Sequence, residues 1–412
     1  MQIVWIFVLA FGGIAFAYVL LRTILPWVLN WLDRAPGRDP EILLLSDELP
    51  RYYTTRSNGQ TDPCSRWPGW DGWHVYVLPQ ESSRVQMARG TVMTGLYGLE
   101  GIDNFEKLMW RLSTFQAIEQ LCWLPTDSPE RNGRSVVNNL SQQYLPKSTD
   151  LWMENERLDV TVFGSTVNRE SQQEPYGRIR GTWPDYQFDF VNPQAEAKLS
   201  LRYRAEKVLW WTDLPRLYAH LATFGQYEGE IRYRRKQSLE LSGGDSFPIQ
   251  APGTFEHVFS RKPFGFDRLW LPLRLLGRTF PSLKPLLYHY EVFFDEGELR
   301  GGFVHFRAFG IDLRRRGAFF HGGVRRSITT VQIRYTEPVE TVDCSRIDAP
   351  VVFYRQWEVV AETPEGTLQY SARITHPPAR VSSSFVCYHI RYEGKYCGQP
   401  IAGSGYGEYI RM

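Results

Sequence analysis

The feature that most constrains this chain is an alternation of apolar and polar residues with a period of two, which runs from about residue 150 to the C-terminus. Successive side chains of a strand point to opposite faces, so this alternation indicates strands with one buried face. Aromatic residues, which favour strands, make up 15% of the 412 residues. The pattern predicts strands at 158–163, 186–191, 197–203, 228–233, 288–294, 303–309, 329–335, 351–360, 367–374 and 384–392.

The predicted strands are short and are separated by turns rich in Gly, Pro and Asp. This spacing is typical of antiparallel barrels or sandwiches rather than of βαβ units. We therefore predict a mainly β fold with two antiparallel lobes, at 150–260 and 288–412, joined by an apolar and basic linker at 261–287. A faint repeat, 225–232 against 403–411, is consistent with two related lobes.

Residues 33–149 are predicted to be a linker followed by a mixed region of helix and strand. A short strand is expected at 74–78. Apolar residues at helical spacing predict a helix at 104–123. The polar stretch 125–149 is predicted to be a long loop, and Thr212-Asp-Leu-Pro215 predicts the start of a short helix that ends at Phe224. The fold is thus expected to contain a few helices.

The N-terminus carries a second strong signal, an apolar run from Ile3 to Leu21 that contains no charged residue. Its 19 residues would reach roughly 28 Å as a helix, close to one hydrocarbon core. A cleaved signal peptide is the alternative, but only Met1 and Gln2 precede the run and no suitable cleavage site follows it. We predict a single-pass transmembrane anchor over 1–32.

The flanks of this anchor predict its placement in the membrane. Trp5, Trp27 and Trp31 suit the membrane interfaces, together with Arg22 and Arg34. Arg22, Arg34 and Arg38 all follow the apolar run, which predicts an N-terminus outside and a cytoplasmic C-terminal bulk. The expected location is an inner (cytoplasmic) or photosynthetic membrane.

Small residues mark one face of the anchor. Ala10, Gly13 and Ala17 stand at i, i+3 and i+7, where small side chains allow another helix to approach closely. Two interpretations stay open, a helix partner in the membrane and the general abundance of Gly and Ala in membrane spans.

Composition excludes several function classes. The 47 basic and 45 acidic residues give a net charge of +2, which does not favour a nucleic-acid partner. The five cysteines form no CxxC pair, and the histidines lack the spacing of zinc ligands, so no metal site is predicted. The sequence contains no phosphate-binding or dinucleotide-binding glycine motif.

Five residues are candidates for acid–base chemistry. Glu256 and His257 are neighbours on a predicted strand, so their side chains should point to opposite faces, and a hydrogen bond between the lobes is the alternative role for this pair. His289 and Glu291 stand two residues apart and should share a face, which allows a proton-transfer pair. A solvated pair of polar residues is the alternative there. Glu408 completes the set.

Basic and aromatic residues form candidate surfaces for lipid or for a protein partner. Two basic clusters contain Arg234, Arg235 and Lys236, and Arg314, Arg315 and Arg316. The linker adds Arg268 and Trp270 within a stretch whose four prolines prevent one long helix. Such a stretch suits a membrane surface or a partner groove, and packing between the lobes is the alternative.

Two short motifs carry a resemblance to a known family. Gly-Thr-Phe-Glu-His at 253–257 and Gly-Ser-Gly-Tyr-Gly-Glu-Tyr at 403–409 resemble elements of the hydroxyneurosporene synthase (carotenoid 1,2-hydratase) group. Its wider relatives include tocopherol cyclase-like proteins and fungal Diels–Alderases. The resemblance covers roughly 150–412 and implies a lipocalin-like, two-lobed β fold that holds hydrophobic, often isoprenoid, ligands. It also implies hydration or cyclisation of polyenes.

Two functions follow from these observations. The first is a non-catalytic accessory subunit of a membrane complex, favoured by the anchor and by the lack of a nucleophile–base–orienter set. Because the resembled hydratases occur in carotenoid-making phototrophs, we expect a pigment–protein photosynthetic complex as the host. Its partners would be other membrane-protein subunits and membrane lipid. No cofactor of the chain's own is expected, and lipid, carotenoid or another pigment could bind at the transmembrane helix.

The second function is a membrane-anchored hydratase or cyclase, a carotenoid hydratase-like lyase, acting on a carotenoid-like or other isoprenoid lipid. An open apolar cavity with inward acids would favour this enzyme. A barrel filled by Trp, Phe and Tyr would favour the accessory subunit.

Overall fold

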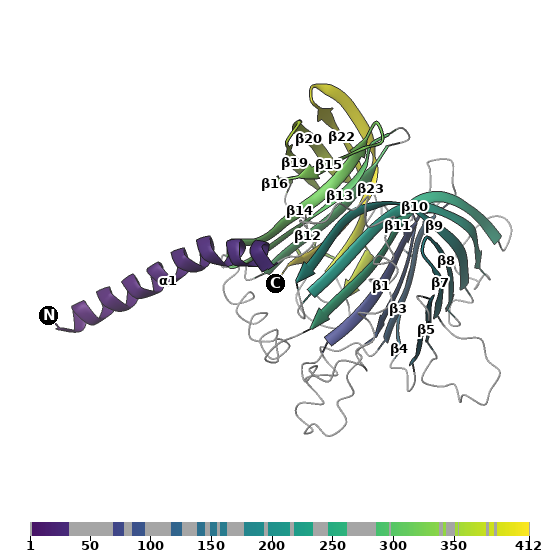
Figure 1. Cartoon of the computed structure of the whole chain (residues 1–412), viewed down its shortest axis with the longest axis horizontal. Coiled ribbons are helices and arrows are strands. Elements are labelled where there is room, and N and C mark those ends of the chain that lie inside the picture. The colour runs from purple at the N-terminus through teal and green to yellow at the C-terminus, as the bar shows by residue number, and fades with distance from the viewer. Residues whose placement is uncertain are drawn as a thin grey trace, which may run out of the picture.

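The computed structural model contains two antiparallel β-lobes and an N-terminal helix that projects from them (Figure 1). The structure describes residues 2–32, 69–77, 85–94, 117–125, 138–144, 149–154, 157–162, 177–192, 197–214, 218–233, 246–261, 286–295, 298–337, 341–342, 351–352, 354–375, 379–382 and 385–411.

The first lobe is an 11-stranded sheet in the order β4-β3-β2-β1-β11-β10-β9-β8-β7-β6-β5. Its strands are β1 (Gly69–Val77), β2 (Val85–Thr94), β3 (Ala117–Pro125), β4 (Asn138–Tyr144), β5 (Thr149–Glu154), β6 (Arg157–Val162), β7 (Gly177–Thr182), β8 (Asp185–Asn192), β9 (Ala197–Leu214), β10 (Tyr218–Tyr233) and β11 (Ser246–Arg261). The first strand pairs with the last, as in an up-and-down barrel, and the sheet stays open between β4 and β5.

The second lobe is a 10-stranded sheet in the order β15-β14-β13-β12-β23-β22-β20-β19-β16, with β21 also paired to β22. Its strands are β12 (Leu286–Phe294), β13 (Arg300–Ala308), β14 (Ile311–His321), β15 (Val324–Ile328), β16 (Thr330–Glu337), β19 (Gln356–Thr363), β20 (Gly366–Ile374), β21 (Ala379–Ser382), β22 (Phe385–Tyr396) and β23 (Gln399–Arg411). Here too the first strand pairs with the last. A separate two-stranded sheet joins β17 (Thr341–Val342) to β18 (Val351–Val352).

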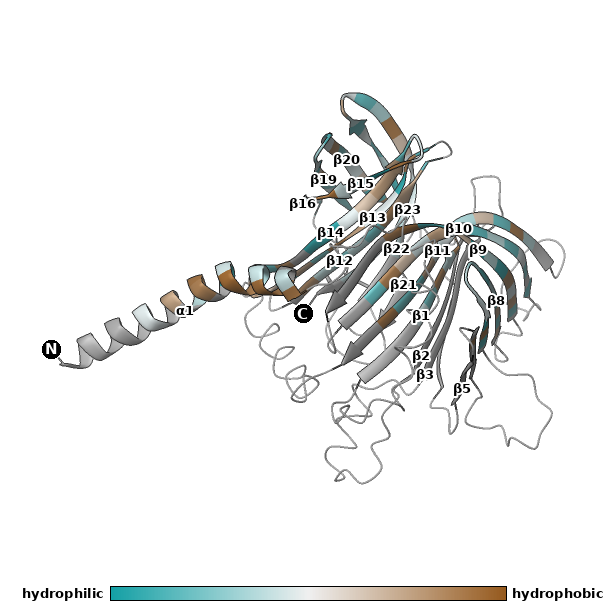
Figure 2. Cartoon of the chain, viewed as in Figure 1, coloured by the Kyte–Doolittle hydropathy of each residue, from teal (hydrophilic) through white to brown (hydrophobic). Residues whose placement is uncertain are grey.

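Successive side chains of a strand point to opposite faces of the sheet, and on β12 both faces are buried, one in the core of the second lobe and one against the first lobe. Figure 2 shows hydrophobic and hydrophilic residues along the strands. On β12, Phe293 points into the core of the second lobe, whereas Tyr290 and Val292 join an apolar cluster that also contains residues of the first lobe. We call this second cluster the inter-lobe cluster. Its buried members are Tyr76, Leu209, Ala222, Phe224, Tyr290, Val292, Phe294, Val304, Phe320 and Tyr406.

Aromatic side chains fill the described interiors of both lobes. Phe188, Tyr203 and Phe255 contact one another in the first lobe with ring centroids 4.9–6.4 Å apart. Trp357 and Tyr370 belong to the core of the second lobe.

The two antiparallel sheets confirm the prediction of a mainly β, two-lobed fold.

The helix predicted at 104–123 is wrong where the structure describes it, because 117–123 belong to strand β3. This strand pairs on one side with β2 and on the other with β4. Pairing on both sides overrides the local helical spacing of the apolar residues. The rest of that predicted helix, 104–116, lies outside the described residues.

Three further expectations about local structure need correction. The predicted helix from Thr212 to Phe224 is replaced by the hairpin strands β9 and β10, which pair along their length. The predicted loop at 125–149 contains strand β4. Instead of a few helices, the described residues contain only α1. Sheet pairing supplies the backbone hydrogen bonds in each case.

Helix α1 spans Gln2–Leu32 and includes Pro26. It meets the second lobe at the β13–β14 turn, where the Tyr18 hydroxyl donates to the Phe309 carbonyl at 3.3 Å. Trp27 and Trp31 are exposed by 66% and 73%. Within the described residues, the structure offers no helix with the length and apolarity needed to span a membrane.

Candidate functional site

Glu256 lies at the contact between the two lobes and exposes only 2% of its surface. Strand β11 places it opposite His74 of β1 and Ala222 of β10. Its side chain points toward the second lobe, because the Tyr290 and Tyr406 hydroxyls both donate hydrogen bonds to its Oε1 atom. A buried carboxylate thus joins strands β11, β12 and β23.

Three hydroxyl groups and one imidazole surround this carboxylate. Tyr406 donates to Oε1 at 2.7 Å and Thr254 donates to the same atom at 3.2 Å, in addition to Tyr290. His220 Nε2 lies 3.1 Å from Oε2. Every group is buried, so the hydrogen bonds form in a medium where they are strong and where breaking them is costly. We call Thr254, His220, Tyr290, Tyr406 and Glu256 the Glu256 site.

Electrostatics in the Glu256 site keep its partners uncharged. Burial lowers the pKa of His220, and the hydrogen bond to Glu256 opposes this effect. Burial, followed by the nearby Glu256 charge, raises the pKa of Tyr290 and of Tyr406 well above their usual value. At neutral pH the site therefore contains a neutral imidazole and two phenols that donate hydrogen bonds.

Glu408 extends the site along the lobe contact. The Tyr76 hydroxyl donates to Glu408 Oε1, and the Tyr76 ring stacks on Tyr406 with centroids 4.1 Å apart. Two of the predicted acids, Glu256 and Glu408, thus lie on the same inter-lobe face. They are linked through Tyr76 and Tyr406.

The remaining candidate residues lie elsewhere. His257 points away from Glu256 into the first lobe, where its ring stacks on Trp73 at 5.1 Å. His289 and Glu291 share a face, as expected, with Nε2 and Oε2 2.9 Å apart inside the second lobe. The five residues therefore divide among three buried places.

The candidate surface residues are only partly described. Arg22 is exposed, as are Trp27 and Trp31. Apart from the neighbouring residues and backbone of α1 itself, the described part of the chain places no atom within 4 Å of a Cβ added at Gly13. Arg315 pairs with Asp312, and Arg316 is partly buried. The structure does not describe the side chains of Trp5, Ala10, Ala17, Arg34, Arg234, Arg235, Lys236, Arg268, Trp270 and Arg314.

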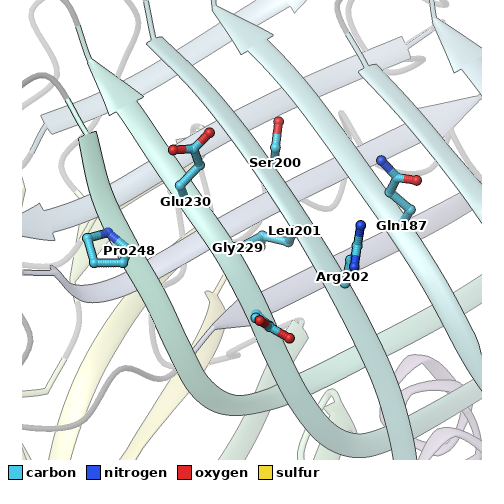
Figure 3. Close-up of a pocket in the computed structure, with 8 residues that line it drawn as sticks. Gln187, Ser200, Leu201, Arg202, Gly229, Glu230 and Pro248 are labelled. Atoms are coloured by element: carbon cyan, nitrogen blue, oxygen red, sulfur yellow. The ribbon is translucent and has the colours of Figure 1, made fainter.

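A hollow of about 420 Å³ lies on the first lobe (Figure 3). It crosses β8 to β11, and Gln187, Arg202 and Glu230 contribute polar groups to it. The hollow shares no residue with the Glu256 site or with the His289–Glu291 pair. The described residues contain no group of His, Cys, Asp and Glu that could hold a metal ion.

Sequence reasoning missed four members of the Glu256 site, His220, Thr254, Tyr290 and Tyr406, and the adjacent Tyr76. Tyr406 belongs to the terminal Gly-Tyr-Gly-Glu motif, and Thr254 belongs to the Gly-Thr-Phe-Glu-His motif, so two of the five had a signal. Tyr76, His220 and Tyr290 come from three other strands. No local sequence pattern predicts that these strands meet.

Solved structures share this architecture. CghA matches with a TM-score of 0.53 and 7% identity over 84% of this chain and 88% of CghA. A structure of CghA with Sch210972 matches with a TM-score of 0.52 and 8% identity over 84% of this chain and 89% of the other. Kievitone hydratase from Nectria haematococca gives a TM-score of 0.43 at 10% identity, over 85% and 91% of the two chains.

No family model matches the sequence, and no curated protein matches it significantly. The likeness to CghA therefore establishes a shared two-lobed, lipocalin-like β fold.

Proposed function

We propose that the protein is an acid–base catalyst of the hydratase or cyclase class that acts on a neutral, lipophilic polyene at the contact between its lobes. The observation that carries this proposal is the Glu256 site, a buried carboxyl group beside a neutral imidazole among aromatic rings. Crystallisation of CghA with Sch210972 supports it further, since a protein of this fold takes a ligand.

The proposed reaction begins with proton transfer from Glu256. In its protonated form Glu256 gives the proton to one carbon of a double bond, which leaves a carbocation on the other carbon and a carboxylate on the enzyme. The π faces of Tyr76, Tyr290 and Tyr406 stabilise a cation, because an aromatic face carries negative potential.

The second step consumes the cation. In hydration, water adds to the carbocation and His220 accepts the proton that the water loses. His220 then returns this proton to Glu256 across the 3.1 Å between Nε2 and Oε2, which restores the starting state. In cyclisation, a second double bond attacks the cation instead and forms a C–C bond and a new cation. This cation loses a neighbouring proton to His220 and becomes a double bond, and His220 passes the proton to Glu256. Entry of a substrate requires the surrounding side chains to move apart, because Glu256 is 2% exposed.

The test is to incubate purified protein with lycopene or neurosporene in detergent and to analyse the products by chromatography and mass spectrometry. We expect a hydrated or cyclised product from the wild type and its loss in Glu256→Gln. Glu358→Gln, which removes a carboxylate exposed beside Arg334, is the matched control and should retain the product. Absence of product from the wild type with both polyenes would contradict the proposed substrate class.

A second candidate function is the accessory subunit of a membrane complex. Two observations favour it: the aromatic filling of the lobes, and the exposed apolar residues of α1, such as Phe16 at 69% and Trp27 at 66%. Under this proposal α1 holds the protein at the membrane, with the β-lobes on its cytoplasmic side. Gly13 is open to a partner helix.

This second function is tested by mild detergent extraction. Gly13→Leu should weaken co-purification of partner subunits while α1 still anchors the protein, because a leucine separates helix backbones that a glycine lets approach. Protease added outside sealed vesicles of native orientation should spare the β-lobes. Unchanged co-purification, or digestion of the lobes, would contradict it.

A further inference from the structure

Three hydrogen-bonded side chains link the core of the second lobe to β16, the edge strand of its sheet. The Tyr335 hydroxyl lies 3.1 Å from His289 Nδ1, and His289 Nε2 lies 2.9 Å from Glu291 Oε2. Tyr335 comes from β16, whereas His289 and Glu291 stand two residues apart on β12. In many enzymes a hydroxyl group is activated by an imidazole base, and a carboxylate orients that imidazole. Tyr335, His289 and Glu291 stand in the same order.

The hydrogen-bond network fixes where the protons lie in these three side chains. Trp357 Nε1 donates to Glu291 Oε2 at 2.8 Å, and the Tyr370 hydroxyl donates to Oε1. Both oxygens of the Glu291 carboxylate are therefore acceptors. Because Oε2 also lies within hydrogen-bond distance of His289 Nε2, we assign the imidazole proton to Nε2, which donates it to Oε2. Nδ1 is then the acceptor, and Tyr335 donates its proton to it.

Packing holds the imidazole in place. The His289 ring is parallel to Phe303 at 5.8 Å and perpendicular to Trp357 at 5.4 Å between centroids. His289 and Glu291 both expose 0% of their surface. A ring confined in this way keeps Nδ1 directed at Tyr335, which is the pre-organisation that proton transfer requires.

Tyr335 itself is half-buried on an edge strand of the 10-stranded sheet. Its ring stacks on Tyr354 with centroids 4.3 Å apart, and Tyr409 stands perpendicular to it at 5.9 Å. The Tyr335 phenol thus lies among aromatic rings on the edge strand of the second lobe. Flat conjugated molecules pack well against the faces of such rings.

We propose that Tyr335, His289 and Glu291 form a second acid–base site, in which Tyr335 takes a proton from a planar, conjugated carbonyl compound at the edge strand of the second lobe. The C–H bond next to the carbonyl breaks, and its electron pair forms the enolate. The proton goes to the Tyr335 oxygen as the proton of Tyr335 goes to His289 Nδ1. The imidazolium then pairs with the Glu291 carboxylate, and the return of both protons to their origins, with reprotonation of the enolate, completes the cycle.

The environment of Tyr335 keeps its hydroxyl protonated until the proton passes to His289. Burial raises the pKa of Tyr335 well above its usual value, and the neighbouring Tyr409 and Glu291 raise it further. The hydroxyl therefore stays protonated at neutral pH, as a serine hydroxyl does before its histidine accepts the proton. This site does not depend on Glu256.

The test measures the reactivity of individual tyrosines in the full-length protein with N-acetylimidazole, followed by peptide mass spectrometry. In this reaction the acetyl C–N bond breaks, a C–O bond to the tyrosine forms, and imidazole leaves with a proton. We expect Tyr335 to be acetylated about 10²-fold faster than Tyr354, the lower end of the range for general-base assistance. Tyr354 is the internal control because it is also half-buried.

His289→Gln should reduce the acetylation rate of Tyr335 to that of Tyr354, and Tyr335→Phe identifies the modified peptide. Circular dichroism shows whether the His289 variant has folded. If it has not, the ratio between the two tyrosines in the wild type decides by itself. Equal acetylation rates of Tyr335 and Tyr354 in the wild type, or an unchanged rate in folded His289→Gln, would overturn the proposal.

Discussion

Replacing Glu256 separates a structural role of the inter-lobe carboxylate from a chemical one. Glu256→Gln keeps the size of the side chain and a carbonyl oxygen that can accept from Tyr290, Tyr406 and Thr254 in place of Oε1. The amide nitrogen then faces His220 in place of Oε2. Glu256→Ala removes both oxygens and leaves a cavity between the lobes.

The expected losses of stability differ between the two variants. In Glu256→Ala, Tyr406 and Thr254 still contact each other at 3.1 Å, but Tyr290 and His220 lose their hydrogen bonds to the carboxylate. A hydrogen bond to a charged group contributes about 1.5–3 kcal/mol, so the loss of these two should cost about 3–6 kcal/mol. Tyr290 keeps its 3.4 Å contact with the Tyr406 hydroxyl. Glu256→Gln retains the hydroxyl acceptor and should cost about 1 kcal/mol.

Activity should follow the opposite order. An amide cannot give a proton to a double bond, so Glu256→Gln should lower turnover by about 10²–10⁴-fold although the protein stays folded. The assay pairs urea denaturation, followed by circular dichroism, with product formation from lycopene or neurosporene. The denaturation slope should be the same in wild type and Glu256→Gln, because the surface exposed on unfolding is unchanged.

Two results would refute this reasoning. If Glu256→Gln destabilises the protein as much as Glu256→Ala, the carboxylate charge itself stabilises the lobe contact. If Glu256→Gln retains full turnover, Glu256 is not the proton donor. The Glu358→Gln control reports any loss that arises from purification alone.

Three further predictions concern stability. Gly253→Ala should lower the free energy of unfolding by about 1–3 kcal/mol, measured by urea denaturation, because its Cβ would lie 2.1 Å from the Tyr76 carbonyl oxygen; an unchanged midpoint would contradict the close approach of β11 and β1. Tyr76→Phe should cost about 1–2 kcal/mol in the same assay through loss of the Glu408 hydrogen bond, and no loss would show that this contact is dispensable. Burial, followed by Arg315, His289 and Arg307, lowers the pKa of His305 to about 3, although its Nε2 atom lies 2.7 Å from Asp312 Oδ1. Between pH 6.5 and about 3 the unfolded state binds a proton at His305 that the folded state does not bind, so the stability contributed by neutral His305 is full above pH 6.5 and falls as the pH decreases through this window. The melting temperature of His305→Gln should therefore fall less than that of the wild type over the same window. Parallel curves of melting temperature against pH would contradict the assignment.

The sequence by itself determined the directions in which the strand residues point. The period-two alternation placed Glu256 and His257 on opposite faces, and His289 and Glu291 on one face, and the structure has them so. These relations hold because the pleat of a strand is local and fixes the side of each residue from its position alone. The mainly β, two-lobed fold follows from the same alternation.

Only the tertiary structure decided which strands pair and which faces meet. At 117–123 the spacing of apolar residues is helical, yet pairing with β2 and β4 makes these residues a strand. The contact between the lobes brings Tyr76, Tyr290 and Tyr406 together from strands far apart in the chain. A strand's hydrogen bonds, and the partners of a buried carboxylate, are satisfied by distant segments, so no local pattern of residues contains them.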